Sequence, residues 1–316
     1  MKEGFLNNIS VVIPFFQRKN GILSRALLSI QNQSSFNAIE HIIVVDDGSP
    51  ISAHNEISQL DRILVSKVKV ISQANAGVSK ARNAGLDYLH AKNAQIIAFL
   101  DSDDVWEKNH ITEMLAAFEC GADFYFSNFY QLGQKKGAFE RAGKINYTEH
   151  KHIEDELFLY SGGMVNQILT GNLIGTPTVA FNAVKFSNNR FQEDLSYAGE
   201  DYFFWLDIAT TSPKIVFSKN CNIVCGEGVN IFSSAKWGTI HLQARLRDEI
   251  LFRDRVLANY NVSNETRDKL NQAIASNEKS FLKNAISTLK AGHYKVIFMT
   301  IAFILKKPKI LLSAFR

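Results

Sequence analysis

Three aspartates follow one apolar run of the sequence and are its first candidates for chemistry. Residues 96–100 are all apolar, and Asp101, Asp103 and Asp104 come directly after them. Such a run predicts a strand buried on both faces, which places the acids at its carboxyl end, where open α/β sheets hold their ligands. Oxygen-only ligands there suit Mg²⁺ or Mn²⁺, and such an ion can hold a diphosphate. The alternative is an acidic turn that caps a helix starting at residues 105–107.

A second acidic turn follows another predicted strand. Asp46 and Asp47 come after a strand expected at residues 40–45, and the Gly-Ser-Pro sequence that follows them predicts a sharp turn. An aspartate at a strand end can accept a hydrogen bond from a base N–H or a ribose hydroxyl. The alternative is that these acids serve only the turn itself.

The stretch from Asn75 to Gly85 follows a short strand predicted at residues 67–72. Gly77 lets the backbone turn tightly, and Arg82 lies near the first turn of the next helix, an arrangement that suits the polar groups of a nucleotide. The stretch lacks GxxxxGK[ST], and no GxGxxG follows a strand anywhere in the chain. ATP hydrolysis and dinucleotide binding therefore have no support from sequence motifs.

Glu200 and Asp201 form a further acidic pair, at the first turn of a helix predicted from the bulky apolar residues that follow them. One of the two can be a partly buried carboxylate that removes a proton during a reaction. The alternative is an acidic first turn that only complements the helix dipole.

Alternating strands and helices are expected to position these residues. Strands are predicted at 9–13, 40–45, 67–72 and 96–100, with helices at 20–33 and 79–91 between them, which favours a parallel, doubly wound sheet. Pro14 and the aromatic residues Phe15 and Phe16 end the first strand, where a ring can stack on a base or pack in the core. Further on, the sequence predicts a strand at 122–126, a polar excursion at 131–160 and a short strand at 178–181.

The composition excludes several classes of protein. The chain has 316 residues, 46% of them hydrophobic, which is enough for a large core. A net charge of +4 without a basic, aromatic-interleaved block argues against nucleic-acid recognition. Three cysteines without a CxxC pair indicate neither a disulfide framework nor a zinc site. Because Met1–Gly4 leads into a strand rather than a signal peptide, and no apolar run approaches the roughly 20 residues of a membrane span, we expect a cytoplasmic protein.

At five places the sequence resembles the family 2 glycosyltransferases of GT-A fold. The matching stretches have the order and spacing of that family and are Val11–Phe16, Val44–Ser49, Asn75–Asn83, Phe99–Asp104 and Gly199–Asp201. The resemblance covers residues 9–210. It implies an α/β protein of GT-A fold, with a doubly wound, mainly parallel sheet. It also implies an inverting transferase that uses a nucleotide-diphosphate sugar, most often a UDP-sugar, together with Mn²⁺ or Mg²⁺.

The resemblance further implies roles for single residues. Those expected around the base and the nearby nucleotide groups are Pro14, Phe16, Asp47, Asn75 and Arg82. Asp101 is expected to face the ribose, and Asp103 is expected to bind the metal ion. For the catalytic base we expect Asp201, with Glu200 as the close alternative.

The sequence departs from the family pattern at two positions. Gln17 stands where Asn is common, and Lys108 stands where proline is frequent. Trp237 and His241 are candidates for the family's contacts to the diphosphate or the acceptor, with a loop that has no such role as the alternative.

The C-terminal third lies outside the resemblance and is predicted to be helical. Apolar residues at helical spacing predict helices at 242–257 and 264–292, so we expect a catalytic domain at 1–235 and a helical region at 236–316. Residues 296–305 are then largely apolar and precede Lys306, Lys307 and Lys309. Such a segment can lie on an anionic membrane surface, which would make the protein peripheral on the inner face of the cell membrane. The alternative is a terminal helix packed on the preceding ones.

These expectations converge on an inverting glycosyltransferase that moves a sugar to a hydroxyl of a glycan acceptor. A lipid-linked acceptor in the synthesis of a bacterial surface polysaccharide is the favoured class, on the strength of the resemblance and of the basic tail. Two alternatives stay open. One is a nucleotide-sugar-binding protein without turnover. The other is a sugar nucleotidyltransferase, which would need a Gly-rich phosphate loop after the first strand, where this chain has Pro14-Phe15-Phe16-Gln17.

Overall fold

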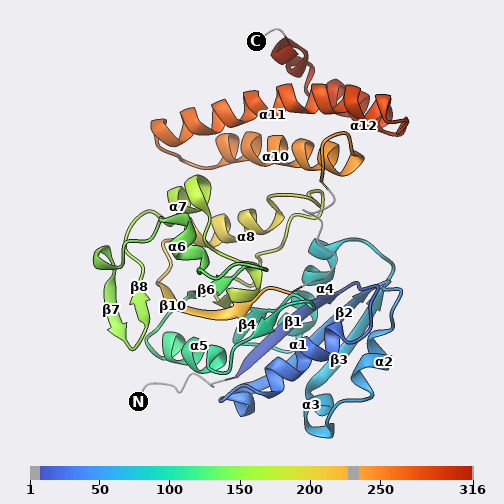
Figure 1. Ribbon diagram of the computed structural model, residues 1–316. Coiled ribbons are helices and arrows are strands. Elements are labelled where there is room, and N and C mark those ends of the chain that lie inside the picture. Colours follow the sequence, from blue (N-terminus) through green and yellow to red (C-terminus); the bar gives the residue numbers. More distant parts are fainter. Residues whose placement is uncertain (1–7, 227–234, 315–316) are drawn as a thin grey trace. The chain divides into compact units, whose positions relative to one another are not determined.

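The computed structural model describes residues 8–226 and 235–314 (Figure 1). Met1–Gly4, which entered the predictions above, lie outside these ranges. The chain forms two compact units, and the sequence passes between them more than once. The first unit comprises Met1–Phe191 and Phe204–Val229, and the second comprises Gln192–Phe203 and Asn230–Arg316. A division of roles between residues 1–235 and 236–316 stays a prediction.

The first unit is built on a ten-stranded sheet of order β3-β2-β1-β4-β9-β6-β10-β8-β7, in which β5 pairs with β10. The strands with the predicted parallel pairing are β1 (Ile9–Phe15), β2 (Ile39–Asp47), β3 (Val68–Gln73) and β4 (Ile96–Phe99). β6 (Phe124–Tyr130) and β10 (Ile215–Val224) are also parallel to each other, whereas β9 (Ala180–Asn182) runs antiparallel to β4 and β6. The mainly parallel α/β architecture expected for a GT-A fold is confirmed.

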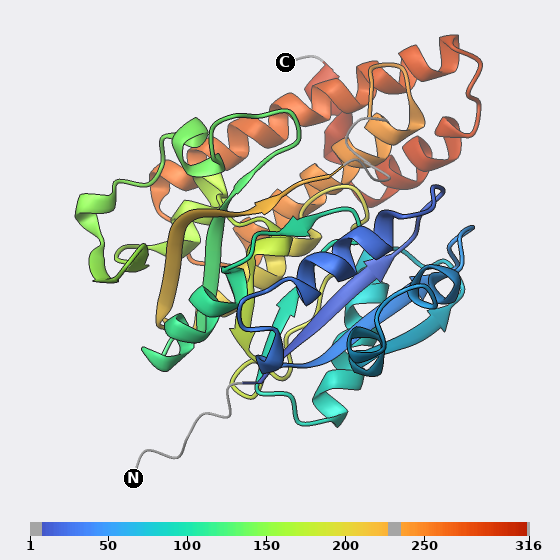
Figure 2. The same ribbon diagram turned by 60° about the horizontal axis from the view of Figure 1, so that its bottom comes forward.

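Helices cover both faces of the sheet around β1 (Figure 2). Successive side chains of a strand point to opposite faces. Val11 and Ile13 pack on α1 (Ile22–Gln31) in one apolar cluster. Val12 faces α4 (Val78–Ala91) on the other side, and a Cβ on Gly85 of that helix would lie 2.5 Å from Val12 Cγ1. Only a glycine therefore lets α4 approach β1 this closely.

The remaining helices of this unit are short and connect the strands. They are α2 (Ala53–Ile57), α3 (Arg62–Lys67), α5 (His110–Glu119), α6 (Ala138–Ala142), α7 (Met164–Gly171) and three 3-10 turns, η1 (Phe36–Ala38), η2 (Tyr147–Glu149) and η3 (Thr176–Thr178). A further helix, α8 (Glu200–Ala209), begins within the second unit and continues into the first.

Three segments differ from the sequence-based expectations. The sequence offered a helix at 105–107 as the alternative for the acids, but Val105–Trp106 is the short strand β5, and α5 begins only at His110. β10 was not predicted, because polar residues interrupt its apolar ends. The segment 131–160 is not only an excursion: it ends in the hairpin β7 (Lys151–Glu154) and β8 (Leu157–Leu159), and β8 pairs with β10.

The second unit is helical, as expected for the C-terminal third. Its main elements are α10 (Ile240–Asn259), α11 (Asn264–Lys290), α12 (Val296–Lys306) and the 3-10 segment η4 (Pro308–Ala314). Thr239 caps α10 by accepting from Leu242 N–H, and Ser263 caps α11 by accepting from Thr266 N–H. Leu246, Ile250, Ile274, Phe281, Phe303 and Ile310 form its apolar core. Within residues 8–226 and 235–314, none of the helices has the length and apolar character that crossing a membrane requires.

Residues 192–203 are fastened to α10 inside this unit. Ser196 and Tyr197 donate their N–H groups to Asp248 Oδ2 at 2.9 and 3.0 Å, and Asp248 is fully buried. The Phe203 ring packs against Phe252, with the ring centroids 5.1 Å apart. Polar and apolar contacts therefore both hold the segment in place.

Candidate functional site

The acid loop, residues 100–104, connects β4 to β5. Asp104 N–H donates to the Asp101 carbonyl oxygen at 3.0 Å, which closes a tight turn. Ser102 is buried in this turn, and its hydroxyl accepts a hydrogen bond from Gln17 Nε2 at 3.1 Å. The order of the strands reverses between β1 and β4, because β2 and β3 extend the sheet on the far side of β1. The acid loop therefore lies at a topological switch point, where α/β sheets of this kind hold their ligands.

Arg82 of α4 faces the acid loop. Its Nη2 lies 2.7 Å from Asp101 Oδ1, and the Arg82 side chain is 5% exposed while that of Asp101 is 28% exposed. Both residues were predicted for the nucleotide site, and the structure brings them together as an ion pair. Since Asp101 keeps the more accessible surface, it is the member of the pair that a ligand can reach.

The carboxylates of the acid loop crowd one another. Burial, and after it the Asp101 carboxylate, raise the pKa of Asp103 to about 6. Burial also raises the pKa of Asp104 well above its usual range, and repulsion from Asp101 and Asp103 adds to this effect. Gly226 N–H donates to Asp104 Oδ1 at 2.9 Å, and Arg25 Nη2 donates to the Asp103 carbonyl oxygen at 2.6 Å. The loop thus gathers more negative charge than these donors offset.

These residues fit a divalent cation. Asp101 and Asp103 supply hard oxygen donors, and a cation would offset the repulsion between them, which adds to burial in raising the pKa of Asp103. In the part of the chain that the structure describes, no group of three or more His, Cys, Asp or Glu side chains could hold a metal ion alone. Mg²⁺ usually takes only one or two carboxylates and completes its shell with phosphate oxygens and water. The acid loop therefore fits the protein side of a metal–diphosphate site.

Asp47 fastens the turn before α4. Its Oδ1 accepts from Gln73 Nε2 and from Ala76 N–H, each at 2.8 Å, and its Oδ2 accepts from Gly77 N–H at 2.9 Å. Asn75 Nδ2 donates to the Asp47 carbonyl oxygen at 2.9 Å. The Asp47 carboxylate therefore holds the turn before α4. The Gly-Ser-Pro turn is held instead by Asp46, whose Oδ1 accepts from Ser49 N–H at 2.8 Å. A direct contact of Asp47 or Asn75 with a nucleotide stays a prediction.

The segment after β1 is tied to both neighbouring loops. Gln17 N–H donates to Ser49 Oγ at 2.9 Å, and the Ser49 hydroxyl donates back to the Gln17 carbonyl oxygen at 3.0 Å. Pro14 is buried in β1, whereas Phe16 is partly exposed just beyond it, with the Arg18 guanidinium carbon 5.9 Å from its ring centroid. Phe16 is therefore the residue of this segment that offers a ring face to a base.

Glu200 and Asp201 form the first turn of α8, as predicted. Asp201 is partly exposed, and its Oδ1 accepts a hydrogen bond from Tyr202 N–H at 2.8 Å. Both acids belong to the second unit, and the acid loop belongs to the first. Their participation in one site stays a prediction. The candidates Trp237 and His241 also belong to the second unit, where Trp237 is 56% exposed and His241 Nδ1 lies 3.1 Å from the hydroxyl of Tyr197.

Three residues that shape the acid loop were not predicted as part of the site. Gln17 was noted only as a departure from the family pattern, and Arg25 and Gly226 were not considered. A Cβ on Gly226 would lie 1.8 Å from the Asp103 carbonyl oxygen, so this glycine permits the close approach of the chain after β10. Their partners are 78 and 122 residues away for Arg25 and Gly226, respectively, and no local pattern indicates contacts of that kind.

A shallow cavity of about 510 Å³ lies between α1 and β5. Its lining includes Arg25, Trp106 and Lys108, but none of the residues predicted for the nucleotide or the metal. The acid loop and its donors therefore identify the candidate site better than the cavity does.

Comparison with known proteins places the chain in a family. A profile described as Glycosyl transferase family 2 matches residues 10–180. The succinoglycan biosynthesis protein ExoW of Rhizobium meliloti is 30% identical over 236 residues, which cover 72% of this chain and 71% of that protein. The UDP-Glc:alpha-D-GlcNAc-diphosphoundecaprenol beta-1,3-glucosyltransferase WfgD of Escherichia coli is 24% identical over 69% of this chain and 76% of its own length.

A solved structure supports the same fold. The mannosyltransferase PcManGT of Pyrobaculum calidifontis, in complex with GDP-Man and Mn²⁺, superposes with a TM-score of 0.58 at 12% identity. The match covers 97% of this chain and 83% of that one. Since the family profile covers more than half of the sequence, the chain belongs to the family 2 glycosyltransferases.

Proposed function

We propose that this glycosyltransferase transfers a sugar from a UDP-sugar to a hydroxyl group of a glycan, with inversion at the anomeric carbon. The observation that carries the proposal is the acid loop at the switch point of the sheet, with Arg82 paired to Asp101 beside the partly buried Asp103. UDP is the favoured nucleotide because the relative WfgD is named for a UDP-Glc donor.

The residues around the loop have distinct roles in the proposal. Asp101 accepts a hydrogen bond from the ribose, and Arg82 keeps the Asp101 carboxylate in place. Phe16 offers its exposed ring face to the base. Asp103, with Asp101 beside it, holds Mn²⁺ or Mg²⁺, and the ion when bound offsets the negative charge that develops on the departing diphosphate.

The acceptor hydroxyl must lose a proton as it attacks. Asp201 is the proposed general base, because it lies at the predicted position on α8 and its side chain is partly exposed. A carboxylate that accepts this proton on the face opposite the departing diphosphate makes the reaction a single displacement, and a single displacement inverts the configuration.

A lipid-linked glycan in surface polysaccharide synthesis is the proposed acceptor. The relative ExoW is named for succinoglycan biosynthesis, and WfgD is named for an acceptor on diphosphoundecaprenol. An acceptor that cannot leave a membrane favours an enzyme that lies on the membrane surface, and the C-terminal helix has a suitable face.

That face is a stripe on α12, which we call the apolar stripe: Ile297, Phe298, Ile301 and Leu305, with exposed fractions of 38, 78, 51 and 77%. Lys295, Lys306 and Lys309 are exposed beside it, and residues 291–316 contain no Asp or Glu. Apolar burial and attraction to anionic lipid can therefore act together. We propose that the apolar stripe lies on the cytoplasmic leaflet of the membrane.

One assay tests the function and its alternatives. Purified protein is incubated with a panel of nucleotide sugars, a glycan acceptor and Mn²⁺ or Mg²⁺, and the released nucleotide is identified. Release of nucleoside diphosphate that depends on acceptor supports the transferase. A second incubation supplies a nucleoside triphosphate and a sugar phosphate, and release of pyrophosphate there would indicate a nucleotidyltransferase. Binding of a nucleotide sugar without turnover in either incubation would indicate a binding protein.

Asp103→Ala tests the metal site within the same proposal. Removing one of few carboxylate ligands should abolish the metal-dependent part of UDP affinity in calorimetry, because the charge of the diphosphate is then no longer offset. Asp123→Ala, which removes an ion pair with Lys185 and a hydrogen bond from Lys214 N–H, is the matched control. An Asp103→Ala protein with the same metal-dependent affinity as the parent would contradict the assignment.

A further inference from the structure

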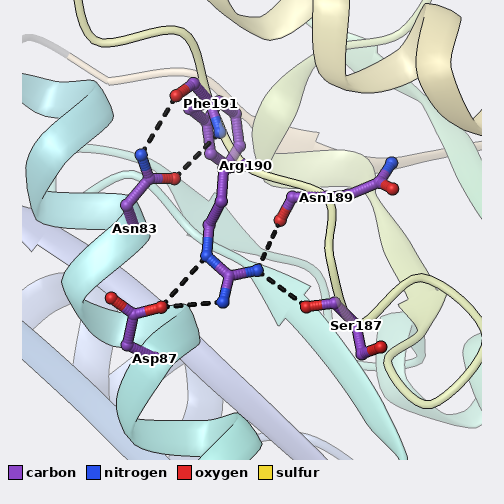
Figure 3. A network of polar contacts seen from close by, with 6 residues as sticks. All are labelled: Asn83, Asp87, Ser187, Asn189, Arg190 and Phe191. Atoms are coloured by element: carbon purple, nitrogen blue, oxygen red, sulfur yellow. Dashed lines mark hydrogen bonds and ion pairs between the residues drawn. The ribbon is translucent and has the colours of Figure 1, made fainter.

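Asn83, next to Arg82 on α4, holds the backbone of Phe191 with both ends of its side-chain amide. Asn83 Nδ2 donates to the Phe191 carbonyl oxygen at 3.0 Å, and Phe191 N–H donates to Asn83 Oδ1 at 2.8 Å (Figure 3). Asn83 is 6% exposed and Phe191 is 2% exposed, so both hydrogen bonds are shielded from water. A buried pair of this kind fixes the position of Phe191 firmly, because breaking it would leave polar groups unsatisfied.

The ring of Phe191 lies directly beside the acid loop's arginine. The Arg82 guanidinium carbon is 5.1 Å from the ring centroid, within the range of a cation–π contact. The same ring packs edge-on against Phe99, the last residue of β4, with centroids 5.2 Å apart. Phe191 therefore touches both the strand that leads into the acid loop and the side chain that binds Asp101.

We propose that Phe191, held by Asn83, is a positioning residue of the donor site: its ring directs the Arg82 guanidinium toward Asp101. The inference rests on the proposed function for its consequence in nucleotide binding, but the contact itself does not. Arg82 and Asn83 are consecutive residues of one helix, so α4 supplies the cation and also the amide that fixes the ring beside it.

A second polar group on the same segment offers an internal comparison. Arg190 Nε and Nη2 donate to Asp87 Oδ1 at 3.0 and 2.8 Å, and Arg190 Nη1 donates to the carbonyl oxygens of Ser187 and Asn189 (Figure 3). The Asp87 side chain is 66% exposed. This pair ties the same segment to the same helix, but it does not involve the Phe191 ring. It therefore separates a general anchoring effect from a specific effect on Arg82.

The first test measures UDP affinity by calorimetry in the presence of Mn²⁺, with the full chain. Phe191→Leu keeps an apolar side chain and both backbone hydrogen bonds but removes the ring, and it should weaken UDP binding by about tenfold, the scale of a partly buried cation–π contact. Asp87→Asn is the control and should leave the affinity within about twofold, the scale of an exposed ion pair. Asn83→Ala should resemble Phe191→Leu if it folds.

A double-mutant cycle with Arg82→Gln, which removes the cation, shows whether the ring acts through the guanidinium. If it does, Phe191→Leu should have little further effect on UDP affinity in the Arg82→Gln background. An undiminished tenfold effect in that background would overturn the inference, because the ring would then act by another route.

The second test needs no nucleotide. In protein labelled with ¹⁵N-arginine, the Arg82 Nη protons should be resolved and slow to exchange in the parent and in Asp87→Asn, and lost to exchange in Phe191→Leu. If the parent binds no nucleotide but shows this pattern, the proposed function fails while the positioning of Arg82 stands. If Phe191→Leu lowers the melting temperature but leaves the Arg82 signals and UDP affinity unchanged, Phe191 is only structural and the inference is wrong.

Discussion

Gly226 is a residue at which the acid loop leaves no room for a side chain. A Cβ there would lie 1.8 Å from the Asp103 carbonyl oxygen and 2.3 Å from Arg25 Nη2, and the carbonyl oxygen cannot move without moving the loop. Gly226→Ala should therefore weaken metal-dependent UDP binding by about tenfold or more, since overpacking displaces backbone. Calorimetry gives the affinity, and circular dichroism confirms the fold. Gly163→Ala is the matched control, because its nearest contact is a side-chain nitrogen at 3.7 Å. Equal affinity in Gly226→Ala and the parent would show that the loop adapts.

Substitution of the two acids of α8 is expected to affect the rate of sugar transfer differently. Asp201→Asn should leave UDP affinity unchanged and slow sugar transfer by about 10²-fold or more, the usual scale of a general base. Glu200→Gln, one residue away, should transfer at nearly the parent rate. Single-turnover kinetics with saturating donor separate the chemical step from binding. A slow Glu200→Gln beside a normal Asp201→Asn would exchange the two roles.

His110 makes stability depend on pH. It is fully buried between Trp106 and Tyr125, and burial lowers its pKa from 6.5 to about 3. Between these two values the unfolded chain binds a proton that the folded chain does not, so the free energy of unfolding falls as the pH falls below 6.5. The limiting slope for one such group is about 1.4 kcal/mol per pH unit.

His110→Gln should remove that part of the pH dependence. Urea unfolding gives the free energy of unfolding at pH 7.5 and at pH 5. The decrease between these two pH values should be smaller in the variant than in the parent by about 2 kcal/mol. Other titrating groups are common to both proteins and cancel in the comparison. Parallel losses in the two proteins would mean that His110 takes up its proton without unfolding.

The sequence indicated single candidate residues where the signal is local. Asp101, Asp103 and Arg82 follow or begin elements with clear apolar patterns, and the structure brings Arg82 of α4 to the loop that carries both acids, while their roles in binding stay predictions. Gln17, Arg25 and Gly226 act through partners that are far away in the sequence, and nothing beside them indicates those partners. Phe191 was likewise not singled out from the sequence, because its contact with Asn83 joins residues 108 positions apart.

At the scale of elements, continuous apolar runs predicted β1, β2 and β4 because these strands are buried on both faces. β10 escaped prediction because Ser218 to Asn222 interrupts its apolar ends, and the strand is recognisable only once β6, β8 and β5 pair with it. β5 has two residues, too few for any periodicity, and exists because it pairs with β10.

α12 has one face packed on the preceding helices and one exposed apolar face, so it has features of both structures predicted for it. Val296, Phe303 and Ile310 are buried, so the C-terminal segment does pack on its neighbours. Lys307 bonds Asp254 at 2.5 Å and Glu278 at 3.0 Å, so it is engaged within the protein rather than available to lipid. The apolar stripe lies on the other side of the helix, which makes truncation after Gly292 a poor test because core residues would be lost with the stripe.

Changes confined to the apolar stripe are the better test of membrane binding. Phe298→Ser combined with Leu305→Ser should lower binding to phosphatidylglycerol vesicles by about 10²-fold, since each apolar side chain withdrawn from lipid costs roughly 1.5–3 kcal/mol. Ile63→Ser, at a position of 65% exposure on α3, is the matched control and should bind like the parent. Flotation in low salt gives the bound fraction. A parent protein that stays unbound but self-associates through the stripe would indicate a contact between copies of the chain instead.

At the scale of the whole molecule, the chain leaves the first unit after Phe191, returns at Phe204 and leaves again near residue 230. The segment that carries Glu200 and Asp201 thus belongs to a unit whose helices lie later in the sequence. The main polar support of this segment is Asp248, a buried carboxylate that accepts two backbone N–H groups and also pairs with Arg247 at 2.6 Å. An exposed ion pair between Asp194 and Arg255 is a second link to α10.

Asp248→Ala should free this segment without unfolding the first unit. Chymotrypsin should then cut at Leu195 or Tyr197 faster than in the parent, because two backbone donors lose their acceptor. Transfer should fall while UDP affinity stays the same. Asp268→Ala, on the exposed side of α11, is the control. A protein that resists cleavage and transfers sugar at the parent rate would show that Asp248 is dispensable for the segment.

The same interleaving sets an order for synthesis on the ribosome. The first unit has all its strands once residue 224 has emerged. Ser196 gains its hydrogen-bond acceptor only when Asp248 emerges, 52 residues after Ser196 itself. A nascent chain can therefore complete the sheet that carries the acid loop while the segment with the two acids still lacks its support. With the roles proposed above for the acid loop and Asp201, sugar transfer is the last property the growing chain acquires, and a ribosome that stalls near residue 230 would leave a protein that holds a donor but cannot use it.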